Sequence, residues 1–214
     1  MAIYERRNAS AYENIMRFNF FGCGEYDIPF IEKDDVNPTE FIGFNYAKTH
    51  KGNTDVCVHF FLDDYQFQRL WNRPDDYINI LQKFGCVMSP DFSLYTDCPK
   101  AMQIYNHYRK HWLAAYWQMH GIKVIPTISW SDESSFEWCF DGEPVGGTVA
   151  VSSVGTQNNK LAKELFTKGY NEMMKKLEPE MIIFYGAIPK ECYGNIIRVK
   201  AFQEKFREAK IDGR

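Results

Sequence analysis

The chain has 214 residues, which is long enough to bury a substantial core within one α/β domain. Hydrophobic residues make up 45% and charged residues 25%, close to the average of globular proteins, so neither a disordered nor a membrane class is indicated. The formal net charge of −3 argues against a protein that binds nucleic acid over its whole surface, although it leaves room for a local basic patch.

The cysteines and the start of the chain bear on the compartment. Six cysteines are spread along the chain without a Cys-x-x-Cys pair, and the first residues lack the apolar stretch of a signal peptide. We therefore expect reduced thiols in a cytoplasm. No apolar run approaches the roughly 20 residues of a membrane-spanning helix, so no membrane partner is expected.

The first 40 residues are aromatic, weakly periodic and interrupted by Gly and Pro, which predicts an extension packed on a single domain covering residues 1–214. Short apolar runs and amphipathic stretches then alternate. The expected strands are 41–44, 56–62, 86–88, 122–128, 148–151 and 181–184. The expected helices are 65–84 with a break at 73–76, then 100–120, 158–177 and 201–210.

This alternation of apolar strands and amphipathic helices indicates a mainly parallel sheet whose faces are covered by helices. Two architectures fit the number of strands: a TIM-barrel-like ring, closed or incomplete, and a doubly wound open sheet. Both collect their ligand sites at the carboxyl ends of the strands.

Polar side chains follow almost every expected strand, and we predict that they meet on one rim. Each taken singly is ordinarily a helix cap or a turn residue, so the prediction rests on their convergence. Asp63 and Asp91 are the candidate catalytic pair, because two carboxylates can bind a divalent cation or divide acid and base roles. Asp64 is expected only to cap the next helix. The candidate ligand-binding residues are Trp130, Ser152, Ser153 and Tyr185.

Ser152 and Ser153 lie between a strand and a helix, where backbone N–H groups and the helix dipole favour an anion such as phosphate. The segment is not a P-loop, because the Gly-Lys-Ser/Thr ending is absent. An ordinary capped turn is the alternative.

His107 and His111 are four residues apart in the longest helix, the spacing of two metal ligands on one face. No third ligand follows nearby, so a packing role is favoured over metal binding. A cofactor is therefore not specified, apart from a divalent cation at Asp63 and Asp91. The Gly-x-Ser-x-Gly, Gly-x-Gly-x-x-Gly and paired Cys-x-x-Cys motifs are all missing.

Several segments in order resemble an uncharacterised domain family of Gram-positive bacteria and their phages, domain of unknown function 4417. They are 89–95, 104–109, 116–118, 121–130, 152–155, 169–170 and 182–186. The resemblance implies a phage or mobile-element protein in a bacterial host cell, with no established activity, cofactor or catalytic residue.

Some members of this family carry a label of rolling-circle replication. Initiators of that kind resemble one another in a His-x-His metal motif and a Tyr nucleophile near Lys. Here His59 is followed by two phenylalanines, although Tyr105 or Tyr108 near Lys110 superficially fits the nucleophile.

Three functions remain open. The first is binding or processing of a small anionic ligand at the strand ends. The second is a noncatalytic protein that binds a host protein or sequesters a metabolite. The third is nucleic-acid processing through a basic patch, which the acidic net charge disfavours. The residues of that patch would be Arg69, Arg73, Arg109 and Lys110.

Overall fold

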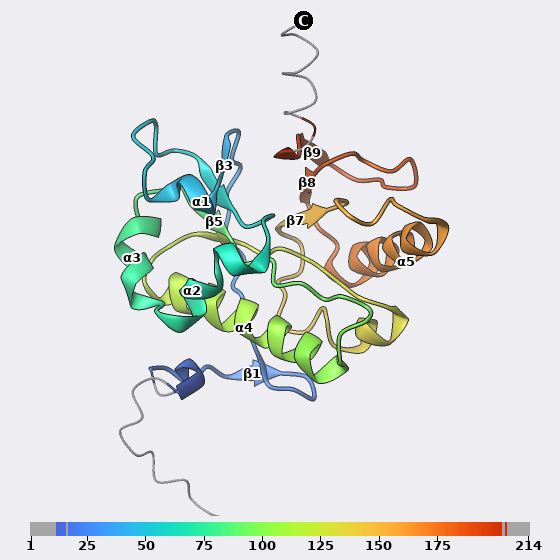
Figure 1. Ribbon diagram of the computed structural model, residues 1–214, viewed down its shortest axis with the longest axis horizontal. Coiled ribbons are helices and arrows are strands. Elements are labelled where there is room, and N and C mark those ends of the chain that lie inside the picture. The colour runs from blue at the N-terminus through green and yellow to red at the C-terminus, as the bar shows by residue number, and fades with distance from the viewer. Residues whose placement is uncertain (1–11, 16, 203, 205–214) are drawn as a thin grey trace, which may run out of the picture.

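The computed structural model describes residues 12–15, 17–202 and 204, and Figure 1 shows their arrangement. The strands are β1 (Gly22–Cys23), β2 (Ile28–Pro29), β3 (Phe41–Gly43), β4 (Cys57–His59), β5 (Cys86–Met88), β6 (Val124–Ile125), β7 (Thr148–Ser152), β8 (Met181–Tyr185) and β9 (Ile196–Val199). The α-helices are α1 (Phe44–Ala47), α2 (Gln68–Asn72), α3 (Asp75–Leu81), α4 (Lys100–Met119) and α5 (Lys160–Leu177). Short 3₁₀ helices are η1 (Tyr12–Asn14), η2 (Asp64–Gln66) and η3 (Glu133–Glu137).

The two larger sheets are parallel, as the alternation of strands and helices predicts. A four-stranded sheet has the order β3-β4-β5-β6, and a three-stranded sheet has the order β7-β8-β9. A parallel bridge between Thr127 and Ala150 connects them. The strands therefore follow one another in space in the order of the chain, and the described residues show no reversal of the doubly wound kind.

The closed TIM barrel considered above is not observed. No strand pairing within the described ranges joins β9 back to β3, so the two sheets form a curved, open succession of strands. The fold is a mixed α/β arrangement of parallel strands and helices, which is the part of the prediction that is confirmed.

Side chains of β7 and β8 alternate between two hydrophobic clusters, because successive residues of a strand point to opposite faces. Ala150, Ile183 and Tyr185 belong to the cluster that includes β4, β5 and the α2–α4 helices. Val149 and Phe184 belong to the cluster covered by α5. Strands of the second sheet thus face the first sheet on one side and α5 on the other.

Helix α4 lies within one residue of its predicted bounds at each end. Gly121 follows it at φ +76°, the left-handed conformation in which glycine ends helices, and its N–H donates to Gln118 O. The predicted break before the next strand is also confirmed, since α2 ends at Asn72 and α3 begins at Asp75, after Pro74.

Other elements differ from their predicted extent. The strand expected over 122–128 pairs as β6 only at Val124 and Ile125, because the chain then crosses to the second sheet. There Ala150 N–H donates to Pro126 O, and Ile128 N–H donates to Ala150 O. β9 was not predicted, and most of the expected helix 201–210 lies outside the described residues.

The described part of the expected N-terminal extension lies against α4. Figure 1 shows the antiparallel hairpin β1–β2 beside this helix, and Trp112 Nε1 donates to Phe18 O at 2.9 Å. Ile31 N–H also donates to Gly142 O. All six cysteines are free thiols. Among the described helices, none combines the length and apolar character needed to cross a membrane.

Candidate functional site

A cavity of about 970 Å³ opens at the carboxyl ends of β3, β4, β5, β7 and β8. We call it the rim cavity. Its polar lining at the strand ends comprises His59, Asp63, Asp91, Ser93, Ser152 and Tyr185. The rest of the lining consists of residues between 41 and 51, the rings of Phe61, Tyr95 and Phe202, and Leu62, Gln66 and Val154. Parallel strands bring their carboxyl ends to one edge, which is why polar groups distant in the sequence meet there.

Four of the six residues that the sequence indicated line this cavity: Asp63, Asp91, Ser152 and Tyr185. Trp130 and Ser153 do not. The Trp130 indole covers Gly169 of α5 and lies 5.3 Å from the Phe166 ring, between centroids, on the outer face of the second sheet. Ser153 is buried and donates from Oγ to Ala187 O at 2.6 Å.

The sequence predicted that Ser152 and Ser153 lie at the start of a helix and bind an anion there, but the helix begins further along the chain. Helix α5 begins only at Lys160, and its N-cap is Asn159, whose side chain accepts a bond from Ala162 N–H. Ser152 Oγ accepts from Val154 N–H instead. The two serines therefore do not lie at a helix N-terminus, and the helix dipole does not act on them.

Asp91 has the most unusual environment of the lining. Its side chain is half-buried, and burial raises its pKa to about 7, with Lys110 opposing the rise and Asp64 adding to it. Such a carboxyl group exchanges a proton near neutral pH. Asp63 is exposed and marks the start of η2, where its side chain makes no capping bond to any described residue.

Asp64 fixes the loop that carries Asp91 and does not cap a helix with its side chain. Its carboxylate accepts bonds from Ser93 N–H at 3.1 Å and from Ser93 Oγ at 2.8 Å. Asn106 of α4 donates to Ser93 O at 2.7 Å. The loops after β4 and β5 are thus tied to each other and to the long helix.

Tyr185 closes the cavity from the opposite sheet. Its ring stacks on Phe61, with centroids 4.8 Å apart, and lies 5.0 Å from the His59 ring. Its hydroxyl oxygen accepts a bond from Phe202 N–H, and burial raises its pKa, so the phenol is a neutral proton donor at pH 7.

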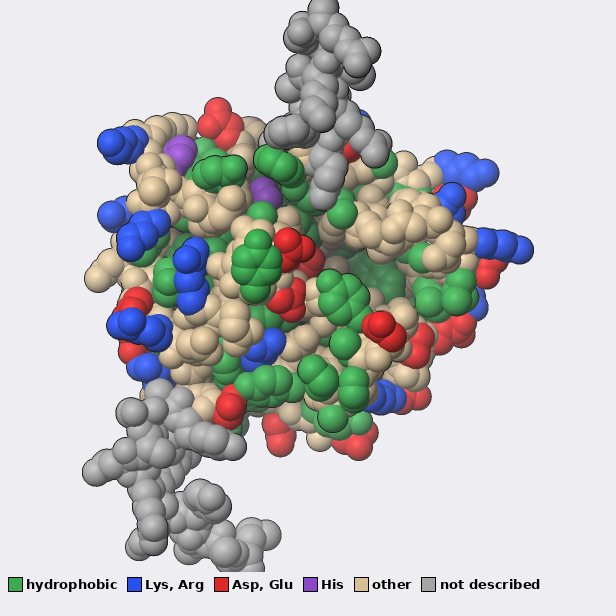
Figure 2. Space-filling model, viewed as in Figure 1, with side chains coloured by type: hydrophobic (Ala, Val, Ile, Leu, Met, Phe, Trp, Pro, Cys, Tyr) green, Lys and Arg blue, Asp and Glu red, His purple; other side chains and the backbone are tan. Residues whose placement is uncertain are grey.

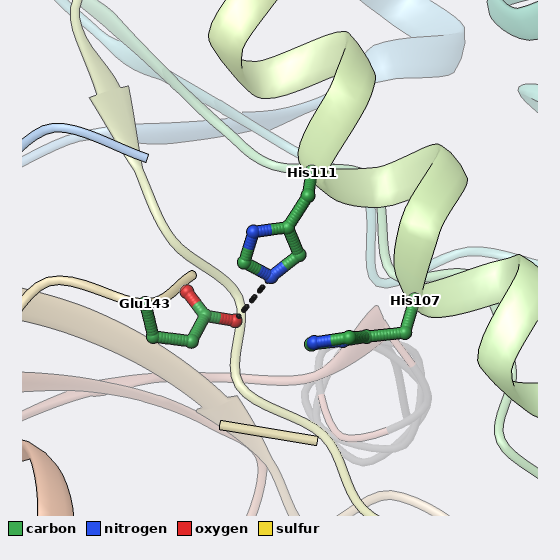
Figure 3. A group of neighbouring side chains, drawn as sticks. All are labelled: His107, His111 and Glu143. Atoms are coloured by element: carbon green, nitrogen blue, oxygen red, sulfur yellow. Dashed lines mark hydrogen bonds and ion pairs between the residues drawn. The ribbon is translucent and has the colours of Figure 1, made fainter. Parts of the chain in front are cut away.

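A second set of polar side chains lies in the interior of the protein and does not line the rim cavity. His107 and His111 project from one face of α4 toward Glu143, in the loop before β7 (Figure 3). Glu143 accepts bonds from Lys110 Nζ at 2.5 Å and lies 3.0 Å from His111 Nε2. We call these four residues the buried polar cluster.

The ionisation of this cluster follows from burial and charge. Burial raises the pKa of Glu143, but Lys110 and His111 together outweigh it and the pKa is lowered. Burial lowers the pKa of His111, with Glu143 opposing, and lowers that of His107 even further. Glu143 is therefore an anion and the two imidazoles are neutral at pH 7.

Sequence reasoning missed three residues of these sites. His59 and Ser93 line the rim cavity. Ser93 lies two positions after Asp91, so the strand-end rule extended by two positions finds it. His59 lies inside the expected strand 56–62, so that rule does not find it. Glu143 lies in a loop without periodicity, 32 residues from His111, and no local signal connects it to the helix.

The comparisons with known proteins agree with the resemblance. A family described as "Domain of unknown function (DUF4417)" matches residues 21–203. The Gene 1 protein of Mycobacterium phage L5 is 38% identical over 175 residues, which cover 81% of this chain and 76% of the phage protein. The Gene 1 protein of Mycobacterium phage D29 is 36% identical over 180 residues, with 81% of this chain and 65% of that protein covered. No solved structure matches.

Proposed function

This chain belongs to the DUF4417 family, and we propose that it binds a small polar molecule in the rim cavity, with Asp91 exchanging a proton with it. The observation that carries this proposal is a carboxyl group with a pKa of about 7 in a cavity at the strand ends. Perturbed carboxyl groups in clefts are characteristic of acid–base sites. The phage relatives add no activity, since their names state none.

The lining indicates what kind of ligand fits. Aromatic rings such as Phe61 and Tyr185 suit a flat apolar portion, whereas Asp63 and Asp91 suit groups that donate hydrogen bonds. An anionic group is favoured only on the side of Lys51, because two carboxyl groups disfavour it elsewhere. The sequence predicted an anionic ligand, and the lining restricts its anionic group to the side of Lys51. A divalent cation between Asp63 and Asp91 remains part of the proposal.

The architecture that we propose around the cavity is an incomplete barrel. Three features support it: the succession of parallel strands in chain order, the bridge from Thr127 to Ala150, and the contact of Tyr185 with Phe61 across the interior. We further propose that the protein works in the cytoplasm of a bacterial host, and its free thiols support that compartment.

A thermal-shift screen with nucleosides, nucleotides, sugars and amino acids tests ligand binding, because a ligand that binds only the folded state raises the melting temperature. We expect one class to stabilise the protein, and Asp91→Asn to weaken that binding at least about tenfold, equivalent to about 1.4 kcal/mol. Asp97→Asn, in the same loop but outside the lining, is the matched control. Equal binding by both variants would contradict the proposal.

Mass spectrometry of the small molecules released on denaturation separates processing from sequestration. A bound molecule that is chemically altered after incubation with the protein indicates an enzyme. A molecule that is recovered unchanged indicates sequestration, the noncatalytic alternative. Binding to a host protein would instead leave the cavity without a ligand and give a partner in a pull-down.

Nucleic-acid processing has one observation in its favour. Lys and Arg side chains gather on one part of the face seen in Figure 2, over α1 to α3, although acidic side chains lie among them. Two of the basic side chains that the sequence suggested for a nucleic-acid surface are bound to groups within the protein. Arg109 donates to Gln68 and Asn106, and Lys110 pairs with Glu143. This candidate is therefore second to ligand binding.

A further inference from the structure

The buried polar cluster brings two imidazoles and a carboxylate to one point. His107 and His111 come from consecutive turns of α4, and Glu143 reaches them from the loop before β7 (Figure 3). One potential ligand atom from each residue lies within 4.8 Å of the others, and all three residues are buried. We propose that His107, His111 and Glu143 bind a divalent transition-metal cation, with Zn²⁺ as the expected occupant.

The hydrogen bonds of His111 give the first argument. Its Nδ1 lies 2.8 Å from Pro29 O, and a carbonyl oxygen can only accept, so Nδ1 carries the proton. In the neutral ring Nε2 then presents a lone pair. That lone pair faces Glu143 Oε1 at 3.0 Å, which is also an acceptor. Two acceptors pointing at each other in a buried place require a cation or a proton between them.

Two further atoms of the cluster lack partners. Within the described part of the chain, His107 Nδ1 and Glu143 Oε2 are buried and make no hydrogen bond. Buried polar atoms are nearly always paired, and an unpaired one costs about 1–3 kcal/mol. Lys110 Nζ binds Oε1 and Thr127 O, so it satisfies one carboxylate oxygen and neither of these atoms.

The donor set selects the class of metal. Two imidazole nitrogens and one carboxylate oxygen suit Zn²⁺ and its neighbours in the first transition row, whereas Mg²⁺ and Ca²⁺ prefer oxygen alone. Metal–ligand bonds of about 2.0–2.1 Å in a tetrahedron place neighbouring ligand atoms about 3.3 Å apart. The 3.0 Å between His111 Nε2 and Glu143 Oε1 is close to that separation.

A hydrogen bond to the backbone orients His111, as is usual for histidines that bind metals. The bond from His111 Nδ1 to Pro29 O fixes the ring and its tautomer, which is the usual outer-shell contact of a metal-binding histidine. Pro29 belongs to β2, so the cation would join the N-terminal hairpin, α4 and the loop before β7. Because all three side chains are closed off from solvent, we assign the proposed site a structural role.

The experiment begins with the complete chain treated with a chelator and checked for folding by circular dichroism. Co²⁺ is then titrated as a spectroscopic probe, and Zn²⁺ is used to displace it. We expect one Co²⁺ per chain with the visible absorption of a protein-bound Co²⁺ ion, and a higher melting temperature after Zn²⁺ is added. A folded wild-type chain that binds neither cation would overturn the proposal.

Substitutions of the proposed ligands test whether these residues bind the cation. Glu143→Gln and His107→Gln are expected to weaken Co²⁺ binding by more than about tenfold, the least that is lost when even an outer-shell partner is removed. His120→Gln, at the end of the same helix and outside the cluster, is the control and keeps wild-type affinity. If Glu143→Gln binds Co²⁺ as tightly as this control, the assignment is wrong. Doubly protonated His111 in ¹⁵N NMR of the metal-treated protein likewise contradicts it, since a proton would then occupy the place of the cation.

The inference does not depend on the rim cavity. Neither His107, His111 nor Glu143 lines that cavity, and the spectroscopic readout requires no ligand or activity there. Loss of Co²⁺ binding in Glu143→Gln with normal ligand binding would separate the two sites.

Discussion

At the scale of single residues, Asp91 differs from Asp63, the other carboxyl group in the rim cavity, because it is half-buried. Burial raises its pKa to about 7, and Lys110 moderates the rise. The charge of Asp91 therefore changes in the pH range where cells live. The neighbouring Asp63 is exposed to solvent.

Asp91 should make the stability of the protein fall as pH rises. The unfolded carboxyl group loses its proton near pH 4, whereas the folded one keeps it until about pH 7, so stability declines between these values. Each unit of pKa corresponds to about 1.4 kcal/mol, which gives a decline of a few kcal/mol. Urea denaturation at pH 5 and pH 8 measures it. Asp91→Asn should flatten this dependence relative to Asp97→Asn, and identical pH profiles in the two variants would refute the assignment.

Lys110 shows how one buried charge supports another. Its ammonium group binds Glu143 Oε1 and Thr127 O, and both side chains of the ion pair are almost fully enclosed. Lys110→Met leaves the carboxylate of Glu143 without this cation, so we expect a loss of about 3–5 kcal/mol in the free energy of unfolding. Denaturation curves measure it, with Lys100→Met at the exposed start of the same helix as control. A loss below about 1 kcal/mol would mean that another cation neutralises Glu143.

At the scale of elements, α5 depends on close contact with Trp130. A Cβ atom built on Gly169 lies only 2.2 Å from Trp130 Nε1, so the indole occupies the space that any other residue would need. This explains why Trp130 packs outside the rim cavity, although its place after a strand made it a candidate ligand-binding residue.

Gly169→Ala should therefore destabilise the protein by about 1–3 kcal/mol, although alanine is normally the better helix former. Thermal or urea denaturation measures the change. Trp130→Leu combined with Gly169→Ala should recover part of the loss, because the smaller side chain leaves room. A double variant whose loss equals the sum of the single losses would show that the two residues do not interact.

The start of α5 gives a second prediction at this scale. Asn159 Oδ1 accepts a bond from Ala162 N–H at 2.9 Å, which satisfies one of the free N–H groups at the helix start. Asn159→Ala should cost about 1 kcal/mol of stability. Asn171→Ala, in the middle of the same helix and exposed, should be neutral or slightly stabilising. Equal effects at both positions would show that the cap is unimportant.

At the scale of the whole molecule, the rim cavity arises because two parallel sheets place their carboxyl ends on one side. The cavity receives Asp63 and Asp91 from the first sheet and Ser152 and Tyr185 from the second. The cavity is lined by both acidic and basic side chains, and the net charge of the chain is −3. These features favour a small ligand over a nucleic-acid backbone.

We accordingly expect weak binding to single-stranded and duplex DNA. Gel-shift titrations at low and at physiological salt measure it, and any binding at low salt should vanish as the salt concentration rises, because it would rest on a few surface lysines and arginines. Arg73→Ala, on the surface beside α3, probes that contribution, and Lys190→Ala in the loop after β8 is the control. Tight binding that persists at physiological salt would favour the nucleic-acid alternative.

The sequence by itself determined the order of strands β3 to β8 and helices α2 to α5, the bounds of α4 and the break between α2 and α3, because periodicity, proline and glycine act locally. It also selected Asp63, Asp91, Ser152 and Tyr185, since the end of a parallel strand can be recognised from the chain. Only the tertiary structure decided that Trp130 and Ser153 face elsewhere and that Glu143 joins His107 and His111. Those contacts connect residues distant in the chain, and no local pattern encodes which loop a buried side chain will meet.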